Sequence, residues 1–167
     1  MRRLLLLALT AFVLAACGGS KDTATTTATT VEAGDPAAAA GGGTTLYHGG
    51  DWAVVVDGDK AVALHFAGGE WQPDRTGRVK VEVLGPKPVS TPTPQVAAQL
   101  SASTPLVESG LWIDGVELLA KGGGLAPTRG TIYGAPDGKL AKGRHLAVAY
   151  ARTATAATAV ARPFVVR

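Results

Sequence analysis

The sequence has little cysteine, few aromatic residues and little charge, and each shortage excludes a class of protein. A single Cys in 167 residues excludes an intramolecular disulfide and any metal site built from several cysteines. Aromatic residues make up 5% of the chain and charged residues 17%, which argues against a large enzyme of mixed chemistry. With 22 Gly and 10 Pro the chain is instead rich in turns, and its length suits one domain of ordinary size.

The first 16 residues have the pattern of an export signal. Arg2 and Arg3 form a short basic region, and an apolar run of 11 residues, 4–14, follows them. This run is shorter than the ~20 apolar residues that a bilayer-spanning helix needs. Removing the segment leaves 14 basic and 13 acidic residues. Such a near-neutral balance gives no reason to expect a nucleic-acid partner.

The end of this segment places the only cysteine directly after two small residues, in Leu14-Ala15-Ala16-Cys17. The motif resembles the lipobox of bacterial lipoproteins, which receive a diacylglyceryl thioether on the Cys and are cleaved just before it. The resemblance implies that Cys17 is a lipid attachment site, carrying acyl chains such as palmitate. It also implies an extracytoplasmic protein held at the bacterial cell membrane or cell surface, because two or three acyl chains make a stable anchor. The alternative is an ordinary signal peptide cut near Ala16, which would leave an inert thiol.

Residues 17–45 are predicted to be the lipidated Cys and a disordered tether. The 28 residues that follow Cys17 are rich in Thr, Ala and Gly and contain no Leu, Ile, Phe, Tyr, Trp or Met. Such a segment buries too little apolar surface to offset the entropy of ordering it. The four alanines at 37–40 are too few to nucleate a helix. We therefore expect the folded part to begin near Leu46.

The rest of the chain is predicted to be all β. Residues 52–56 and 61–66 flank an Asp-Gly turn, which predicts a hairpin within an N-terminal extension at 46–77. Alternating valines predict a half-buried strand at 78–84, and further strands are expected at 95–102, 111–113, 116–119, 131–133, 144–152 and 158–166. Residues 86–94 are expected to form a Pro-rich crossover, and 119–130 a loop. Short strands with frequent turns indicate a sandwich or a barrel.

Three segments within residues 78–167 carry a second resemblance. Leu111-Trp112-Ile113-Asp114-Gly115, Leu140-Ala141-Lys142-Gly143-Arg144-His145 and Ala161-Arg162-Pro163-Phe164-Val165-Val166 occur in that order. They are similar to a hairpin, the entry to the penultimate strand and the closing strand of bacterial immunoglobulin-like domains. The resemblance implies an immunoglobulin-like Greek-key β-sandwich, without the paired cysteines of antibody domains. It implies no catalysis, because this fold hosts many functions. The additional N-terminal β-hairpin lies outside the match, and either adds strands to a sheet or covers an edge.

The three histidines, His48, His65 and His145, show no metal-ligand spacing, so the sequence predicts no metal and no cofactor. The resemblance implies that His145 occupies a structural corner, where its side chain bonds the backbone near the preceding loop. His65 is expected to be a solvent-facing residue of its strand.

Tryptophans offer a different kind of site. The resemblance assigns Trp112 to the core of the sandwich. Trp52 and Trp71 flank the extra hairpin, so they are the candidates for an exposed binding surface that would take a sugar or a peptide. The alternative, that both pack between the hairpin and the sandwich, is favoured over an exposed surface.

Together these features predict a membrane-anchored extracytoplasmic lipoprotein that is not an enzyme. Its immunoglobulin-like module would bind or support other parts of the cell envelope, with an envelope protein or a glycan as partner. The alternative is an accessory or ligand-binding lipoprotein of an envelope enzyme or transport system, with a small-ligand site near Trp52 and Trp71. A hydrolase is least favoured, since no acid–base or nucleophile pair is visible.

Overall fold

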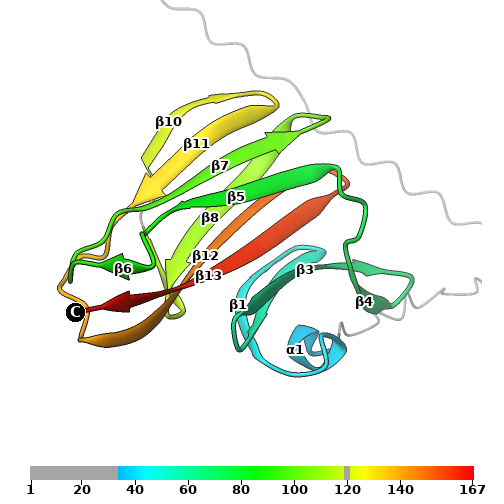
Figure 1. The fold of residues 1–167 in the computed structure, drawn as a ribbon. Helices are drawn as coiled ribbons and strands as arrows, with labels where there is room; N and C mark the ends of the chain where they lie inside the picture. The colour runs from blue at the N-terminus through cyan, green and yellow to red at the C-terminus, as the bar shows by residue number, and fades with distance from the viewer. Residues whose placement is uncertain (1–33, 119–120) are drawn as a thin grey trace, which may run out of the picture. The chain divides into compact units, whose positions relative to one another are not determined.

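The computed structural model describes residues 34–118 and 121–167, with side chains described outside 121–126, and this part of the chain is nearly all β (Figure 1). The signal segment, Cys17 and the first part of the expected tether lie outside the described residues. The elements are α1 (Pro36–Ala39), β1 (Thr44–Gly49), β2 (Trp52–Asp57), β3 (Lys60–Ala67), β4 (Glu70–Pro73), β5 (Val79–Gly85), β6 (Val89–Ser90), β7 (Val96–Ala102), β8 (Leu106–Ile113), β9 (Val116–Glu117), β10 (Lys121–Ala126), β11 (Arg129–Gly134), β12 (Gly143–Thr153) and β13 (Ala157–Val166).

The strands form three sheets. The N-terminal sheet has the order β1-β2-β3-β4, the outer sheet β10-β11-β7-β5, and the central sheet β6-β13-β12-β8-β9. β6 pairs with β13 in parallel, and the other pairings are antiparallel. The all-β prediction is therefore confirmed.

The central sheet is buried on both faces, and β12 shows this most clearly. Ala147, Ala149 and Ala151 belong to the core that the central sheet shares with the outer sheet. Val148 and Tyr150, on the opposite face, pack in a second core together with residues of the N-terminal sheet. The sequence predicts these two sets of residues on opposite faces of one strand. The structure adds that neither face is solvated, so the sheets form three layers.

Both predicted Asp-Gly hairpins are confirmed. In the first, Asp57 pairs with Lys60 and Gly58 has a φ of +55°. In the second, Ile113 pairs with Val116, and the two turn residues, Asp114 and Gly115, have φ values of +50° and +85°. The second hairpin thus has positive φ at both central positions, as a two-residue type I′ turn requires. Gly adopts this conformation without strain, and Asp tolerates it.

The N-terminal extension is a four-stranded sheet, in which β2 and β3 form the predicted hairpin and the strands β1 and β4 were not predicted. β1 begins within the predicted tether, and its Leu46 and Tyr47 pack against the core between the N-terminal and central sheets. β4 contributes Trp71, which is buried on the other face of the same sheet. Both strands gain their stability from contacts distant in sequence, which a local pattern does not reveal.

A second correction concerns the expected loop at 119–130. It contains β10 and the start of β11, and these strands pair from Lys121 opposite Tyr133 to Ala126 opposite Arg129. Glycine in a strand lowers its propensity, and three consecutive glycines favour a loop on local grounds. Main-chain hydrogen bonds to β11 override that preference. The Pro-rich crossover likewise contains the short strand β6.

The last part of the expected tether is ordered, so the predicted boundary near Leu46 was also wrong. The side chain of Asp35 accepts a hydrogen bond of 2.9 Å from the Ala37 amide, and Pro36 stands in the first turn of α1. The indole Nε1 of Trp71 donates a 2.6 Å hydrogen bond to the carbonyl of Gly34. The four residues of α1 are too few to form a helix in isolation, but the cap at Asp35 and the contact with Trp71 stabilise the turn.

The edge strand β5 is covered by side chains from the central sheet. The hydroxyl of Thr158 donates a 2.7 Å hydrogen bond to the carbonyl of Val79, and the guanidinium of Arg162 donates to the carbonyl of Val83. These two bonds satisfy main-chain acceptors that β7, on the other side of β5, does not use.

Candidate functional site

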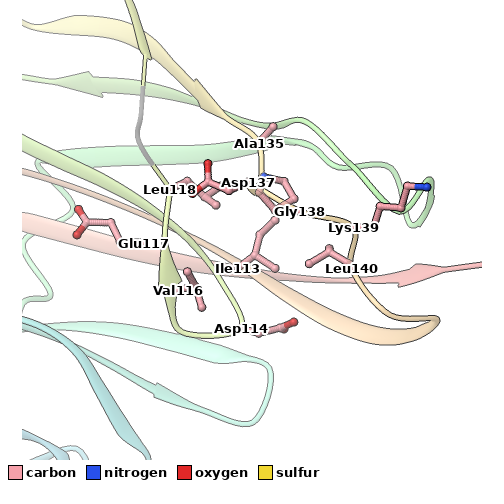
Figure 2. Close-up of a pocket in the computed structure, with 11 residues that line it drawn as sticks. Ile113, Asp114, Val116, Glu117, Leu118, Ala135, Asp137, Gly138, Lys139 and Leu140 are labelled. Carbon is pink, nitrogen blue, oxygen red and sulfur yellow. The ribbon is translucent and has the colours of Figure 1, made fainter.

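A pocket of about 290 Å³ lies between the β8–β9 hairpin and the loop that joins β11 to β12 (Figure 2). Its apolar lining comes from Ile113, Val116, Leu118, Ala135, Pro136 and Leu140. Its polar lining comes from Asp114, Glu117, Asp137 and Lys139. The volume lies at the lower limit of the range typical of small-ligand sites, about 300–1,000 Å³.

The lining suits an apolar group that makes polar contacts at its edge. Figure 2 shows Glu117 and Lys139 extending away from the pocket on opposite sides, so their charges lie at the rim. Val116 is 68% exposed although it belongs to a strand, which leaves an apolar side chain uncovered beside the opening. This arrangement can hold a side chain of a partner or a small molecule.

His145 and Asp114 form a clip that holds the two walls of this pocket together. His145 Nδ1 lies 2.6 Å from Asp114 Oδ2, and its Nε2 lies 2.8 Å from the carbonyl of Ala141. The other carboxylate oxygen of Asp114 accepts a 2.9 Å hydrogen bond from the Leu146 amide. The clip therefore links the β8–β9 turn to the loop before β12. The sequence analysis expects a backbone partner for His145 near that loop, and this partner is Ala141.

The charge state of the clip follows from its geometry. Both ring nitrogens of His145 face acceptors, and an imidazole donates from both only when it is protonated. The hydrogen bond to Asp114 raises the pKa of His145 above its ordinary value, and the bond to the Ala141 carbonyl adds to this effect. With both nitrogens engaged, the ring offers no free position for proton transfer. We therefore assign His145 a structural role in shaping the pocket.

Trp52 and Trp71 do not form an exposed binding surface, so that expectation was wrong. Trp52 is 5% exposed and packs between the N-terminal and central sheets, in the same core as Trp112. Trp71 is 7% exposed and packs on the opposite face of the N-terminal sheet, beside α1. Only Trp52 has the position that the alternative expectation gave to both. Trp52 is in register with Gln72 across the sheet. Trp71 precedes Gln72 on β4, so its side chain points to the opposite face.

His65 also differs from its expectation as a solvent-facing residue. It lies directly opposite Trp52 in the β2–β3 pair, and the two rings stack with centroids 4.2 Å apart. Its side chain is therefore half-buried on the inner face of the N-terminal sheet. His48, in contrast, is exposed on β1 with its ring edge toward Trp71.

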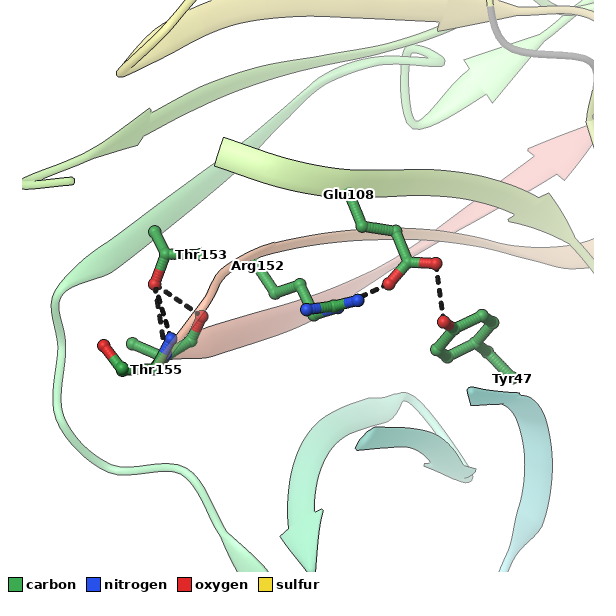
Figure 3. A network of polar contacts seen from close by, with 6 residues as sticks. Tyr47, Glu108, Arg152, Thr153 and Thr155 are labelled. Atoms are coloured by element: carbon green, nitrogen blue, oxygen red, sulfur yellow. Dashed lines mark hydrogen bonds and ion pairs between the residues drawn. The ribbon is translucent and has the colours of Figure 1, made fainter. Parts of the chain in front are cut away.

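The sequence analysis missed a polar network between the N-terminal and central sheets (Figure 3). The carboxylate of Glu108 accepts a 2.5 Å hydrogen bond from the Tyr47 hydroxyl and another of 2.5 Å from Arg152 Nε. Burial, followed by the bond to Glu108, raises the pKa of Tyr47 to about 12. The nearby hydroxyl of Tyr150 is buried and has no partner among the described residues. Tyr47 lies 61 positions from Glu108, so no local pattern pointed to the network.

Comparison with known proteins adds no relative. No protein-family model matches the chain, and no curated protein matches its sequence. Within residues 34–118 and 121–167, no cluster of three His, Cys, Asp or Glu side chains is placed to bind a metal ion. In the same residues no helix has the length and apolar character needed to cross a bilayer. The functional argument therefore depends on the chain's own residues.

Proposed function

We propose that the protein is an extracytoplasmic bacterial lipoprotein, anchored to a membrane through acyl chains on Cys17. One observation carries the proposal: the only cysteine of the chain directly follows Leu14-Ala15-Ala16 at the end of a basic and then apolar segment. Two small residues before the cysteine suit entry of an extended chain into a peptidase. The ordered residues 34–45 do not belong to the tether proposed from composition.

We further propose that residues 78–167 form an immunoglobulin-like Greek-key sandwich. The strand order supports it. If seven strands are lettered A to G along the chain as β5, β7, β8, β10, β11, β12 and β13, the outer sheet has the order D-E-B-A and the central sheet contains G-F-C. These are the two sheets of a constant-type immunoglobulin domain. In this assignment β9 extends the central sheet beyond C, and β6 adds a parallel strand beside G.

The role proposed for this module is binding or structural support in the cell envelope, without catalysis. Its two prominent polar pairs, His145 with Asp114 and Arg152 with Glu108, join separate elements of the fold. Their side chains hold strands and loops in place. Because these charged side chains bind one another within the fold, they favour a structural or binding role for the module.

The proposed anchor is tested by moving the cysteine. The wild-type protein is expected to partition into the detergent-rich phase and to resist salt extraction from membranes, and Cys17→Ser is expected to abolish both. A second variant combines Cys17→Ser with Ser20→Cys, which restores a cysteine at the wrong distance from Ala15 and Ala16. It is expected to behave as Cys17→Ser does. Equal partitioning of all three proteins would overturn the anchor.

The pocket beside the Asp114–His145 clip favours a second candidate function, an accessory lipoprotein that binds one ligand or one partner. This pocket replaces the site near Trp52 and Trp71, whose rings are buried. Affinity purification from native membranes separates the candidates. One defined complex that Leu140→Trp abolishes, and that Val107→Trp on the exposed start of β8 preserves, would favour the accessory role. Several partners unaffected by Leu140→Trp would favour the general module.

A further inference from the structure

A second pocket, of about 340 Å³, lies at one end of the interface between the N-terminal and central sheets. Its floor is a row of three residues in register across β2, β3 and β4, Trp52, His65 and Gln72. Exposure increases along this row, from buried Trp52 through half-buried His65 to exposed Gln72. The central sheet thus covers only the first residue of the row, and the other two remain accessible from the pocket.

The opposite walls are held in place by hydrogen bonds before any ligand arrives. Asp74 accepts a 2.8 Å hydrogen bond from the Thr76 amide with one carboxylate oxygen and a 2.5 Å bond from the Ala157 amide with the other. The turn between β12 and β13 is fixed by the buried hydroxyl of Thr153, which accepts bonds from the amides of Thr155 and Ala156 (Figure 3). Thr155 lines the pocket from this turn. Walls that are already ordered reduce the entropy cost of binding.

The groups that remain available have a specific chemistry. His65 supplies an aromatic ring that is backed by buried Trp52, while Gln72 supplies an amide and Thr155 a hydroxyl. A pyranose ring fits these groups, because its C–H face can pack on an aromatic ring and its hydroxyls can form hydrogen bonds with the amide of Gln72 and the hydroxyl of Thr155. Arg75 also lines the pocket, is exposed, and forms no ion pair with any described residue.

We propose that this pocket binds a saccharide that carries a carboxylate group. The sugar ring would pack on the accessible part of the His65 ring, and the carboxylate would pair with Arg75 in the two-point geometry that guanidinium groups favour. Both oxygens of Asp74 accept bonds from main-chain amides, and this carboxylate forms no ion pair with Arg75, so the guanidinium is available to the ligand. The inference does not depend on Cys17 or on the lipid anchor, so the two proposals fail separately.

The test uses two trisaccharides that differ only in charge, cellotriose and the same sugar oxidised at each C6 to a carboxylate. The full-length chain in detergent micelles is titrated with each, and binding is followed through the NMR signals of the Trp52 indole and the Gln72 side-chain amide. The oxidised trisaccharide is expected to shift both signals in a saturable way. Cellotriose is expected to bind at least about tenfold more weakly, because it lacks the charge-assisted bonds to Arg75.

Variants locate the contact. Arg75→Gln is expected to weaken binding of the oxidised trisaccharide about tenfold and to leave cellotriose unchanged, whereas His65→Ala weakens both. Arg78→Gln is the matched control, because Arg78 is an exposed arginine three residues away that does not line the pocket. Equal binding of the two sugars, absence of a shift at Trp52 and Gln72, or an equal effect of Arg75→Gln and Arg78→Gln would overturn the proposal.

Discussion

The two buried faces of the central sheet differ in kind. The face toward the outer sheet is mainly aliphatic, and β12 contributes alanines to it, which leave room for Leu111 and the single aromatic ring of Phe164 from the neighbouring strands. The face toward the N-terminal sheet is aromatic, with Trp52, Trp112 and Tyr150 in contact. One strand therefore presents its small side chains to one neighbour and its large side chains to the other.

The difference shows how a third layer is joined to a sandwich. The core toward the outer sheet consists mainly of aliphatic side chains, whereas the aromatic interface ends in the hydrogen bonds of Glu108 to Tyr47 and Arg152. Aromatic rings cover a large area with few rotatable bonds, and a tyrosine places a polar tip where the interface reaches solvent. We infer that the N-terminal sheet folds as a part of the sandwich, since its inner face has no other cover.

The largest effect is expected for Trp52→Ala, which breaks the aromatic interface. Removing a buried Trp typically costs about 3–5 kcal/mol, and the variant should still unfold in one transition if the two interfaces are cooperative. Thermal unfolding followed by circular dichroism measures both the loss and the number of transitions. A separate early transition, in which the N-terminal sheet melts alone, would show that the layers are independent.

The aliphatic face is tested by the opposite change, Ala149→Leu. Ala149 is fully buried against the outer sheet, so the added methylene and methyl groups have no space, and overpacking typically costs about 1–3 kcal/mol. Denaturant unfolding gives the loss. Ala38→Leu, on the exposed side of α1, is the control and should change stability by less than about 0.5 kcal/mol. Equal effects at the two positions would mean that β12 has space for a larger residue.

His145→Ala tests a contact that lies outside both cores. Loss of the clip to Asp114 and Ala141 is expected to cost about 1–3 kcal/mol at acidic to neutral pH. The pKa of His145 is raised in the folded state, so protonation favours folding. The contribution is complete below the pKa of the unfolded chain, near 6.5, and is lost as the pH rises through the higher folded value.

Unfolding of wild type and His145→Ala across pH 5–9 measures this dependence. The stability difference should be constant at the acidic end and should shrink toward the alkaline end. A difference that does not change with pH would contradict the assignment of a protonated ring between two acceptors.

The smallest effect is expected for Tyr150→Phe, and its sign is the informative part. The Tyr150 hydroxyl is buried without a partner among the described residues, so its removal should leave stability unchanged or raise it by up to about 1 kcal/mol. Chemical unfolding measures the change, with Tyr47→Phe as the matched control. Tyr47 donates to Glu108, so Tyr47→Phe should be destabilising. A clear loss in Tyr150→Phe would show that its hydroxyl is bonded, for example to a buried water.

Much of the strand pattern could be predicted because it depends on neighbours in sequence. The two Asp-Gly turns place positive φ where Gly permits it, and the alternating valines of β5 are buried at Val79 and Val83 as the pattern requires. The sequence of β12 also indicates burial on both faces, which the prediction of its alternation did not include. An alternation of Ala with Val and Tyr is an alternation of size within apolar residues, and it indicates burial on both faces.

The remaining features depend on contacts that no local window contains. α1 is ordered by Trp71, which is 37 positions from Gly34, and β10 is held by β11 despite its three glycines. Burial of Trp52 between the hairpin and the sandwich was among the expectations, but burial of Trp71 on the other face of the N-terminal sheet was not, because α1, which covers that face, was not predicted. The Asp114–His145 clip was predicted in part. The backbone partner of His145 near the preceding loop was expected, but its carboxylate partner Asp114 was not.

The side chains that cover β5 have a consequence for how copies of this protein meet. An uncovered edge strand offers a row of carbonyls and amides to which a strand of another molecule can pair, and this is a common route to aggregation. In β5 two of those carbonyls are already occupied, by the hydroxyl of Thr158 and the guanidinium of Arg162. Both groups come from β13, so the edge is closed only after the last strand has joined. Completion of the fold thereby makes these two acceptors unavailable to a strand of another chain.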